Sequence, residues 1–163
     1  MKIGIIDNKQ SGLVRDILKE NIKKESKLSI AAAHFTLYAF AELKKELSKV
    51  SEFRFIFTEP FDVNNNLENG NTIYGVNEEH TYKLNLDQGY IAKRVAEWLE
   101  EKAQIKSIVN QKIEGGLYHI DNEDGSQIGL VGGAPFSTTG LGFTNSTNIY
   151  INNIIEDDKT NEQ

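Results

Sequence analysis

The sequence has 163 residues, of which 39% are hydrophobic and 26% are charged, and its formal net charge is −6. These values are typical of one globular domain, and they exclude a disordered chain and a protein that coats nucleic acid through bulk positive charge. The sequence contains no cysteine, which excludes a disulfide framework, a thiolate zinc site and a cysteine nucleophile.

No apolar run has the length of a membrane span, and the first residues turn polar too quickly for a secretory signal. We therefore expect a cytoplasmic protein without a membrane partner.

The first third of the chain alternates between strand and helix signals. Short apolar runs predict three strands, and apolar residues at helical spacing predict two helices between them. In chain order these are a strand at Ile3–Ile6, a helix at Ser11–Glu25 with Ser11 as its N-cap, a strand at Leu28–Phe35, a helix from Thr36 to about Val50, and a strand at Phe53–Thr58. The last three elements have the spacing of a βαβ unit, for which a right-handed crossover is expected.

The pattern changes between Phe61 and Asn85. Asparagine and acidic residues are frequent there, which predicts a long loop with Ile73–Val76 and Tyr82–Leu86 as short edge strands or loop anchors. Helical periodicity returns at Leu86–Ala103, and Ile105–Val109 is predicted to be a further strand.

A hairpin is predicted next. Two apolar runs, Gly116–Ile120 and Gln127–Gly132, flank the sequence Asn-Glu-Asp-Gly at residues 122–125. Asp-Gly between apolar runs is a strong hairpin signal, so the two runs are expected to pair. Asn148–Ile155 is predicted to be the last strand. Residues 156–163 are predicted to be a polar tail, which leaves 1–155 as a single domain.

The second strand of the hairpin enters a loop of small residues at positions 132–140. Such a composition lets a backbone approach another group closely, which is often a phosphate, but it also makes an ordinary tight loop. Ser137, Thr138 and Thr139 could bind a phosphate through hydroxyl and backbone N–H groups. Their alternative role is to cap a helical turn.

The three histidines of the chain do not have the spacing of metal ligands, so neither a metal nor a cofactor is expected. His34 ends an apolar run, a position more typical of a core histidine than of a catalyst. His80 lies in the acidic loop, where solvation is expected.

Three blocks of sequence, taken in their order and spacing, resemble a known family. They cover residues 29–40 with 53–60, residues 91–102 with 105–107, and residues 114–142 with 148–152. Together they are similar to the phospholipase D-like domain at the N-terminus of certain bacterial Swi/Snf-type and restriction-associated helicases. The resemblance implies an α/β fold with a mixed, largely parallel sheet flanked by helices, which forms one phospholipase D- or nuclease-like half.

The chemistry of that family depends on a signature of histidine, any residue and lysine, followed by an aspartate after four intervening residues. A Gly-Ser-x-Asn segment follows on the next strand. Two copies meet across a twofold axis, where one histidine attacks phosphorus and the other protonates the leaving oxygen. The resemblance therefore implies that a chain with one copy forms a homodimer.

This sequence departs from the signature at most of its positions. Glu114 stands at the histidine position and Gly116 at the lysine position, and only Asp121 agrees. In the second segment the serine and asparagine positions hold other residues, so that the segment reads Gly132, Gly133, Ala134, Pro135. His119 lies on the same strand but is not followed by a lysine. Without lysines the site lacks the positive charge that phosphoryl transfer requires, so no hydrolysis is expected.

We therefore expect a catalytically degenerate phospholipase D-like accessory domain of a helicase- or restriction-type protein. It would dock DNA or support dimerisation, and the helicase motor would follow it in the full-length protein. One alternative is an active, metal-independent phosphodiesterase or nuclease that uses His119 or His34 in a rearranged site. Another is a protein-interaction module without a nucleic-acid role. A twofold cleft centred on Asp121 and Pro135 would favour the first two, and a monomer with that cleft filled would favour the third.

Overall fold

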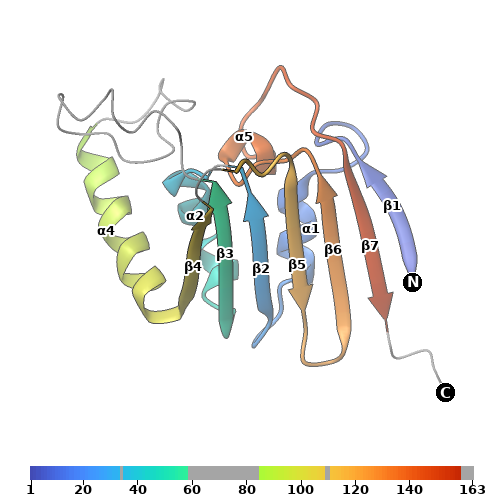
Figure 1. The fold of residues 1–163 in the computed structure, drawn as a ribbon, viewed down its shortest axis with the longest axis horizontal. Coiled ribbons are helices and arrows are strands. Elements are labelled where there is room, and N and C mark those ends of the chain that lie inside the picture. The colour runs from blue at the N-terminus through green and yellow to red at the C-terminus, as the bar shows by residue number, and fades with distance from the viewer. Residues whose placement is uncertain (34, 59–84, 109–110, 159–163) are drawn as a thin grey trace.

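Seven strands form one mixed sheet in the order β1-β7-β6-β5-β2-β3-β4 (Figure 1). The architecture comes from a computed structural model that describes residues 1–33, 35–58, 85–108 and 111–158. The strands are β1 (Lys2–Ile6), β2 (Lys27–Ala32), β3 (Glu52–Thr58), β4 (Ala103–Ile108), β5 (Gly116–Asp121), β6 (Ser126–Gly132) and β7 (Asn152–Asp158). The helices are α1 (Val14–Asn21), α2 (Leu37–Glu42), α3 (Lys44–Leu47), α4 (Asn85–Lys102) and α5 (Thr138–Leu141).

The sheet consists of a parallel half, β2 to β4, and an antiparallel half, which contains β5, β6, β7 and β1. β2, β3 and β4 pair in parallel, whereas all other pairings are antiparallel. The predicted α/β domain with a mixed sheet flanked by helices is confirmed, but the expectation that the sheet is largely parallel is wrong. The reason is that β5, β6 and β7 are joined by a tight turn and a loop, and such connections produce antiparallel neighbours.

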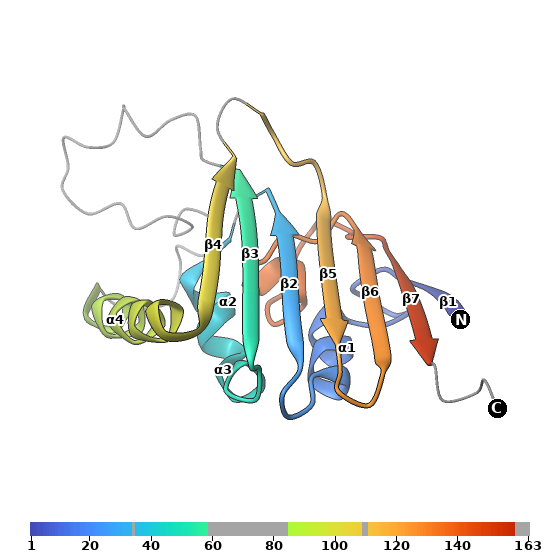
Figure 2. The same cartoon turned by 60° about the horizontal axis from the view of Figure 1, so that its bottom comes forward.

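The helices of the described residues pack on one face of the sheet or at its β4 edge (Figures 1 and 2). α2 and α3 connect β2 to β3, and α4 leads into β4, so both steps move in the same direction across the sheet. Crossovers of the same hand and direction leave their helices on the same face, and α4 accordingly packs beside α2. The opposite face, which we call the open face, receives no helix from the described residues.

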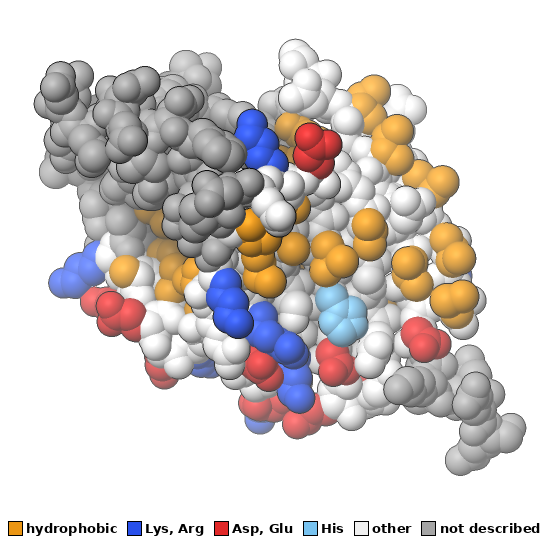
Figure 3. Space-filling model, in the orientation of Figure 1, with side chains coloured by type: hydrophobic (Ala, Val, Ile, Leu, Met, Phe, Trp, Pro, Cys, Tyr) orange, Lys and Arg blue, Asp and Glu red, His pale blue; other side chains and the backbone are white. Residues whose placement is uncertain are grey.

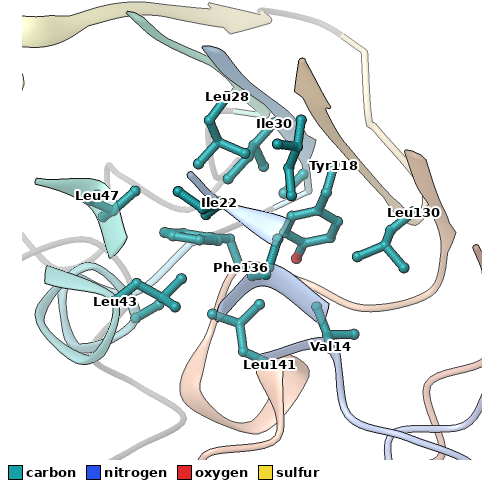
Figure 4. Packing of buried hydrophobic residues seen from close by; sticks show 14 of the residues in the cluster. Val14, Ile22, Leu28, Ile30, Leu43, Leu47, Tyr118, Leu130, Phe136 and Leu141 are labelled. Atoms are coloured by element: carbon teal, nitrogen blue, oxygen red, sulfur yellow. The ribbon is translucent and has the colours of Figure 1, made fainter. Parts of the chain in front are cut away.

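Alternate residues of each strand point toward the helices and form the core. Leu28, Ile30 and Ala32 of β2 follow this pattern and are at most 2% exposed. Over the parallel half the core is aromatic, with the rings of Phe40, Phe53 and Phe55 in mutual contact. Over the antiparallel half it is mostly aliphatic. Leu130 lies there beside Tyr118, close to the packing of Val14, Phe136 and Leu141 (Figure 4).

The first two predicted helices differ from their observed counterparts. The helix expected from Ser11 begins at Val14, because the side chain of Asn8, rather than that of Ser11, accepts a hydrogen bond from the Val14 amide at 3.0 Å. The helix start predicted at Thr36 is confirmed, since Thr36 is the N-cap of α2 and its Oγ1 accepts from the Ala39 amide at 3.3 Å. The helix that begins there divides into α2 and α3 at Leu43.

The predicted hairpin is confirmed by β5 and β6. Gly125 has φ 83°, a left-handed conformation that suits glycine, and its amide donates to the Asn122 carbonyl at 3.0 Å. The ammonium group of Lys23, at the end of the α1 region, lies 2.6 Å from Asp124 in the turn. This hydrogen-bonded ion pair and a contact with Ser126 hold the pKa of Asp124 well below its usual range.

The C-terminal boundary was placed too early. Residues 156–158 belong to β7, where Glu156 is paired with Lys2 of β1 and Asp158 with Ser126 of β6. Backbone pairing with two neighbours extends the strand beyond its apolar residues, which the side-chain pattern did not indicate. Residues 148–151, predicted to be in the strand, precede it. The edge strands predicted at 73–76 and 82–86 lie outside the described residues, except for residues 85 and 86, which belong to α4. Residues 159–163 also lie outside the described residues.

Candidate functional site

The loop after β6, residues 132–140, contains the positions of the second segment of the family signature. Its backbone is held by buried side chains from other elements. Tyr118 of β5 donates its hydroxyl to the Ala134 carbonyl at 2.9 Å, and Asn152 of β7 accepts from the Ala134 amide at 3.3 Å. Burial raises the pKa of Tyr118 far above its usual value, so the phenol remains a hydrogen-bond donor.

The far end of the loop is fixed in the same way. Asn8 is 6% exposed, and its amide nitrogen donates to the carbonyls of Thr139 and Gly140 at 3.1 and 2.9 Å. Polar side chains are thus used to satisfy the loop's backbone groups, which makes the loop a rigid part of the fold.

Two glycines at the start of this loop allow backbone segments to meet. Gly116 and Gly132 are paired across β5 and β6. A Cβ atom at position 116 would lie 2.3 Å from the Ala134 carbonyl oxygen, and one at position 132 would lie 2.1 Å from the Ile151 carbonyl oxygen. Neither position can carry a side chain without movement of the backbone. The close approach expected from the glycines therefore takes place within the protein, and the lysine position at Gly116 is closed.

The other signature positions do not converge. Glu114 is exposed and precedes β5, whereas Asp121 ends this strand of 6 residues. Glu114 and Asp121 are thus on the order of 20 Å apart along the chain. Gly133 is exposed and Pro135 is buried, both at the Glu114 end. Asp121 and Pro135 therefore do not centre a common cleft.

Ser137, Thr138 and Thr139 begin the short helix α5. Ser137 is its N-cap, and its hydroxyl accepts from the Gly140 amide at 3.0 Å. The hydroxyls of Ser137 and Thr139 lie 3.2 Å apart, as do those of Thr138 and Thr144. These contacts are those of the capping alternative, and phosphate binding at these residues stays a prediction.

His119 lies on the open face, in register with Ser29 of β2 and Gly129 of β6. Asp121 follows two positions later on the same face, and no lysine stands at that position. His34 and His80 lie outside the described residues. Among the residues that are described, no group of three or more His, Asp or Glu side chains is placed to hold a metal ion. Over the same residues, no helix combines the length and apolar character needed to cross a bilayer.

A feature that sequence reasoning missed is a basic stripe on the open face of the parallel half. Lys27, Arg54 and Lys106 stand on β2, β3 and β4, and each is advanced by two residues relative to the one before. Their Cα atoms are consequently about 8 Å apart along a diagonal. All three are exposed (Figure 3). The signal in the sequence was a basic residue at an outward position of two predicted strands, Arg54 and Lys106, and one directly before the third, Lys27.

The stripe holds three cations beside two carboxylates, because Glu52 and Asp121 are the cross-strand neighbours of Lys27. Arg54 pairs with Glu52 of its own strand at 3.1 Å. Lys27 and Lys106 have no ion-pair partner among the described residues. A chain with net negative charge thus holds a local row of cations on a flat surface.

The arrangement of strands and helices matches known structures. The crystal structure of yeast tyrosyl-DNA phosphodiesterase aligns with a TM-score of 0.55 and 9% sequence identity over 94% of this chain. A mutant of tyrosyl-DNA phosphodiesterase 1 from yeast aligns with a TM-score of 0.53 and 10% identity over the same share. The chain shares its fold with this enzyme over most of its own length.

The similarity to the yeast enzyme is one of fold, because the sequence identity is only 9 to 10%. This chain spans 31% of the length of the yeast enzyme. No family model matches the sequence, and no curated protein matches it. In this chain the glycine-rich loop after β6 packs against Gly116, the first residue of β5.

Proposed function

We propose that this chain is a non-catalytic phospholipase D-like module that docks nucleic acid and self-associates. It serves a helicase- or restriction-type motor that follows it in a longer protein. The helicase context is supported by the three sequence blocks that resemble the N-terminal domains of such proteins. The nucleic-acid role is supported by the fold shared with yeast tyrosyl-DNA phosphodiesterase, whose name identifies a DNA-linked substrate.

The absence of catalysis follows from the closed lysine position. Phosphoryl transfer requires cationic groups that stabilise the charge on the phosphate oxygens. A lysine at position 116 would place its Cβ against the Ala134 carbonyl, and Pro135 has no side-chain amide to contact a phosphate oxygen. His119 lies on the open face and not at the Gly116 end of the strand. This geometry argues against the alternative of an active nuclease.

The basic stripe is the observation that carries the docking role. Cations at intervals of about 8 Å can follow the phosphates of a nucleic-acid backbone, where binding is driven largely by release of counterions. The residues that pair with Lys27, Arg54 and Lys106 on the neighbouring strands of the parallel half are not aromatic. We therefore expect contacts with the backbone rather than stacking on bases, and hence little sequence preference.

The test is a gel-shift and cleavage assay with labelled single- and double-stranded DNA in EDTA at low salt. The wild-type chain should shift DNA without cutting it. The variant Lys27→Gln/Arg54→Gln/Lys106→Gln should bind at least about tenfold more weakly. The slope of log affinity against log salt concentration should also fall in magnitude by about two. The matched control, Lys24→Gln/Lys44→Gln/Lys45→Gln, removes three exposed charges from the helix side and should bind like wild type.

Equal loss in both triple variants would show that only net charge matters and would exclude the stripe as the docking surface. Cleavage that survives EDTA and disappears in His119→Ala would overturn the non-catalytic assignment. The absence of any shift would favour a protein-interaction module without a nucleic-acid role.

A further inference from the structure

The open face of the antiparallel half is apolar. Its exposed side chains are mostly β-branched: Ile3 and Ile5 of β1 are each 65% exposed, Ile155 of β7 is 38% exposed and Val131 of β6 is 42% exposed. Leu117 of β5 is 43% exposed. These residues gather on one side of the face in Figure 3. Apolar patches that extend over several strands are uncommon on monomeric proteins and mark interaction surfaces.

The register of the strands arranges these residues in rows. One row contains Ile5, Asn153, Val131 and Leu117 across β1, β7, β6 and β5. The next row contains Ile3, Ile155, Gly129 and His119, and the row at the end of the sheet contains Asp157, Gln127 and Asp121. The patch is therefore apolar at one end of the strands and acidic at the other.

We propose that this patch binds the same patch of a second copy of the chain, face to face. The proposal rests on the self-association included in the proposed function, and it names the surface. It uses the open face rather than the strand ends at Gly116, and it does not involve the basic stripe.

The pattern of the rows is complementary to itself about one axis. A twofold axis parallel to the strands and above the gap between β7 and β6 places β1 over β5 of the second copy and β7 over β6. Ile5 then faces Leu117 of the second copy, and Ile155 faces Gly129, where the missing side chain leaves room for it. At the polar end, Asp157 faces the amide of Gln127, and no like charges oppose each other.

Other ways of pairing the patches are less favourable. A twofold axis across the strands would place Leu117 over Asp121 of the second copy, which would bury a carboxylate against an apolar side chain. Two sheets that pack in the proposed way keep their strands within about 30° and lie about 10 Å apart. The basic stripes of both copies remain outside the contact, because the parallel halves extend past it on either side.

The size of the patch sets the strength of the dimer. Four strands of about five residues give a footprint of about 320 Å² on each copy. This places the contact in the class of weak or transient interfaces. We expect a monomer–dimer equilibrium that shifts toward the dimer only at high protein concentration.

Sedimentation equilibrium of the protein alone, from about 10 µM to about 1 mM, tests the proposal within that class of affinity. The wild-type mass should rise toward that of a dimer. Leu117→Asp and Ile5→Asp should each weaken the dimer at least about tenfold, because the two residues face each other across the axis and each change places a carboxylate against an apolar side chain twice. The matched control is Ile105→Asp. Ile105 is 41% exposed but points to the helix-bearing side of β4, so its dimer should persist.

Circular dichroism melting checks that each variant is folded. A wild-type chain that stays monomeric at the highest concentration would overturn the proposal, as would equal weakening in all three variants. Since no DNA is present, these outcomes are separate from a failure of nucleic-acid docking.

Discussion

The two halves of the sheet differ in their core side chains and in the side chains that they expose on the open face. The parallel half has an aromatic core beneath it and exposes Lys27, Arg54 and Lys106 on its open face. The antiparallel half has an aliphatic core and exposes a β-branched apolar patch. Parallel strands are usually covered on both faces, and antiparallel strands often have one wet face. On the open face of this protein the reverse holds, because the parallel half exposes charged side chains and the antiparallel half exposes an apolar patch.

This difference shows what the chain topology decides and what it leaves to side chains. Two crossovers that step in one direction place α2, α3 and α4 on one side of the sheet, and α5 and α1 pack beside them, so that the described helices leave the open face uncovered. Charges over the parallel strands suit a polyanion, and aliphatic residues over the antiparallel strands suit a second apolar surface.

Truncation in the core should cost more in the parallel half than in the antiparallel half. Phe55 and Leu130 lie in the same row of the sheet and are each 1% exposed. Phe55 contacts several other rings, including Phe35 at a centroid distance of 5.2 Å. Phe55→Ala should lower the free energy of unfolding by about 4 kcal/mol and Leu130→Ala by about 3 kcal/mol. Urea denaturation measures both, and a larger loss for Leu130→Ala would contradict the view that the aromatic cluster is the stronger core.

Gly116 should not tolerate even a methyl group. Gly116→Ala would place its Cβ 2.3 Å from the Ala134 carbonyl oxygen, and we expect a loss of about 2 to 3 kcal/mol in the free energy of unfolding. Gly133→Ala is the matched control, because nothing lies within 4 Å of its added Cβ. Thermal melts of both variants measure the difference. If Gly116→Ala were as stable as Gly133→Ala, the lysine position would not be closed and the argument against catalysis would lose its basis.

The smallest effect concerns the turn between β5 and β6. The hydrogen-bonded Lys23 ammonium, together with Ser126, lowers the pKa of Asp124 from 3.8. A lowered pKa in the folded state means that the stabilisation is complete above the unfolded value and is lost as the pH falls through the folded one. Asp124→Asn should therefore flatten the loss of stability below about pH 4, by a small and salt-sensitive amount because the pair is exposed.

Glu123→Gln is the control for that titration, since Glu123 is the neighbouring turn residue and is exposed. Melting temperatures at several acidic pH values should be parallel for wild type and Glu123→Gln. A pH profile of Asp124→Asn identical to that of wild type would mean that the ion pair does not stabilise the hairpin.

Local signals in the sequence were sufficient for much of the fold. The Asp-Gly turn identified the hairpin, and Thr36 identified a helix start, because both depend on neighbouring residues only. The pairing of β1 with β7 joins the two ends of the chain and has no local signature. For the same reason, the sequence did not reveal that Asn8, rather than Ser11, binds the first turn of α1.

The candidate site was harder to predict. The substitutions at Glu114, Gly116 and Pro135 were evident, but glycine composition could not distinguish a phosphate from the protein's own backbone as the close neighbour. That distinction requires the position of the Ala134 carbonyl. The basic stripe requires the stagger between three strands, and Lys27, Arg54 and Lys106 are far apart in the sequence.

The most direct test of the division between the halves is one sedimentation experiment with a fluorescent single-stranded oligonucleotide. It compares wild type with Leu117→Asp and with Lys27→Gln/Arg54→Gln/Lys106→Gln. We predict that Leu117→Asp remains a monomer and still binds the oligonucleotide. Its affinity per chain should be close to that of wild type. We also predict that the triple variant still dimerises but binds the oligonucleotide at least about tenfold more weakly than wild type. Loss of both properties in either variant would contradict the claim that the two halves of the open face act separately.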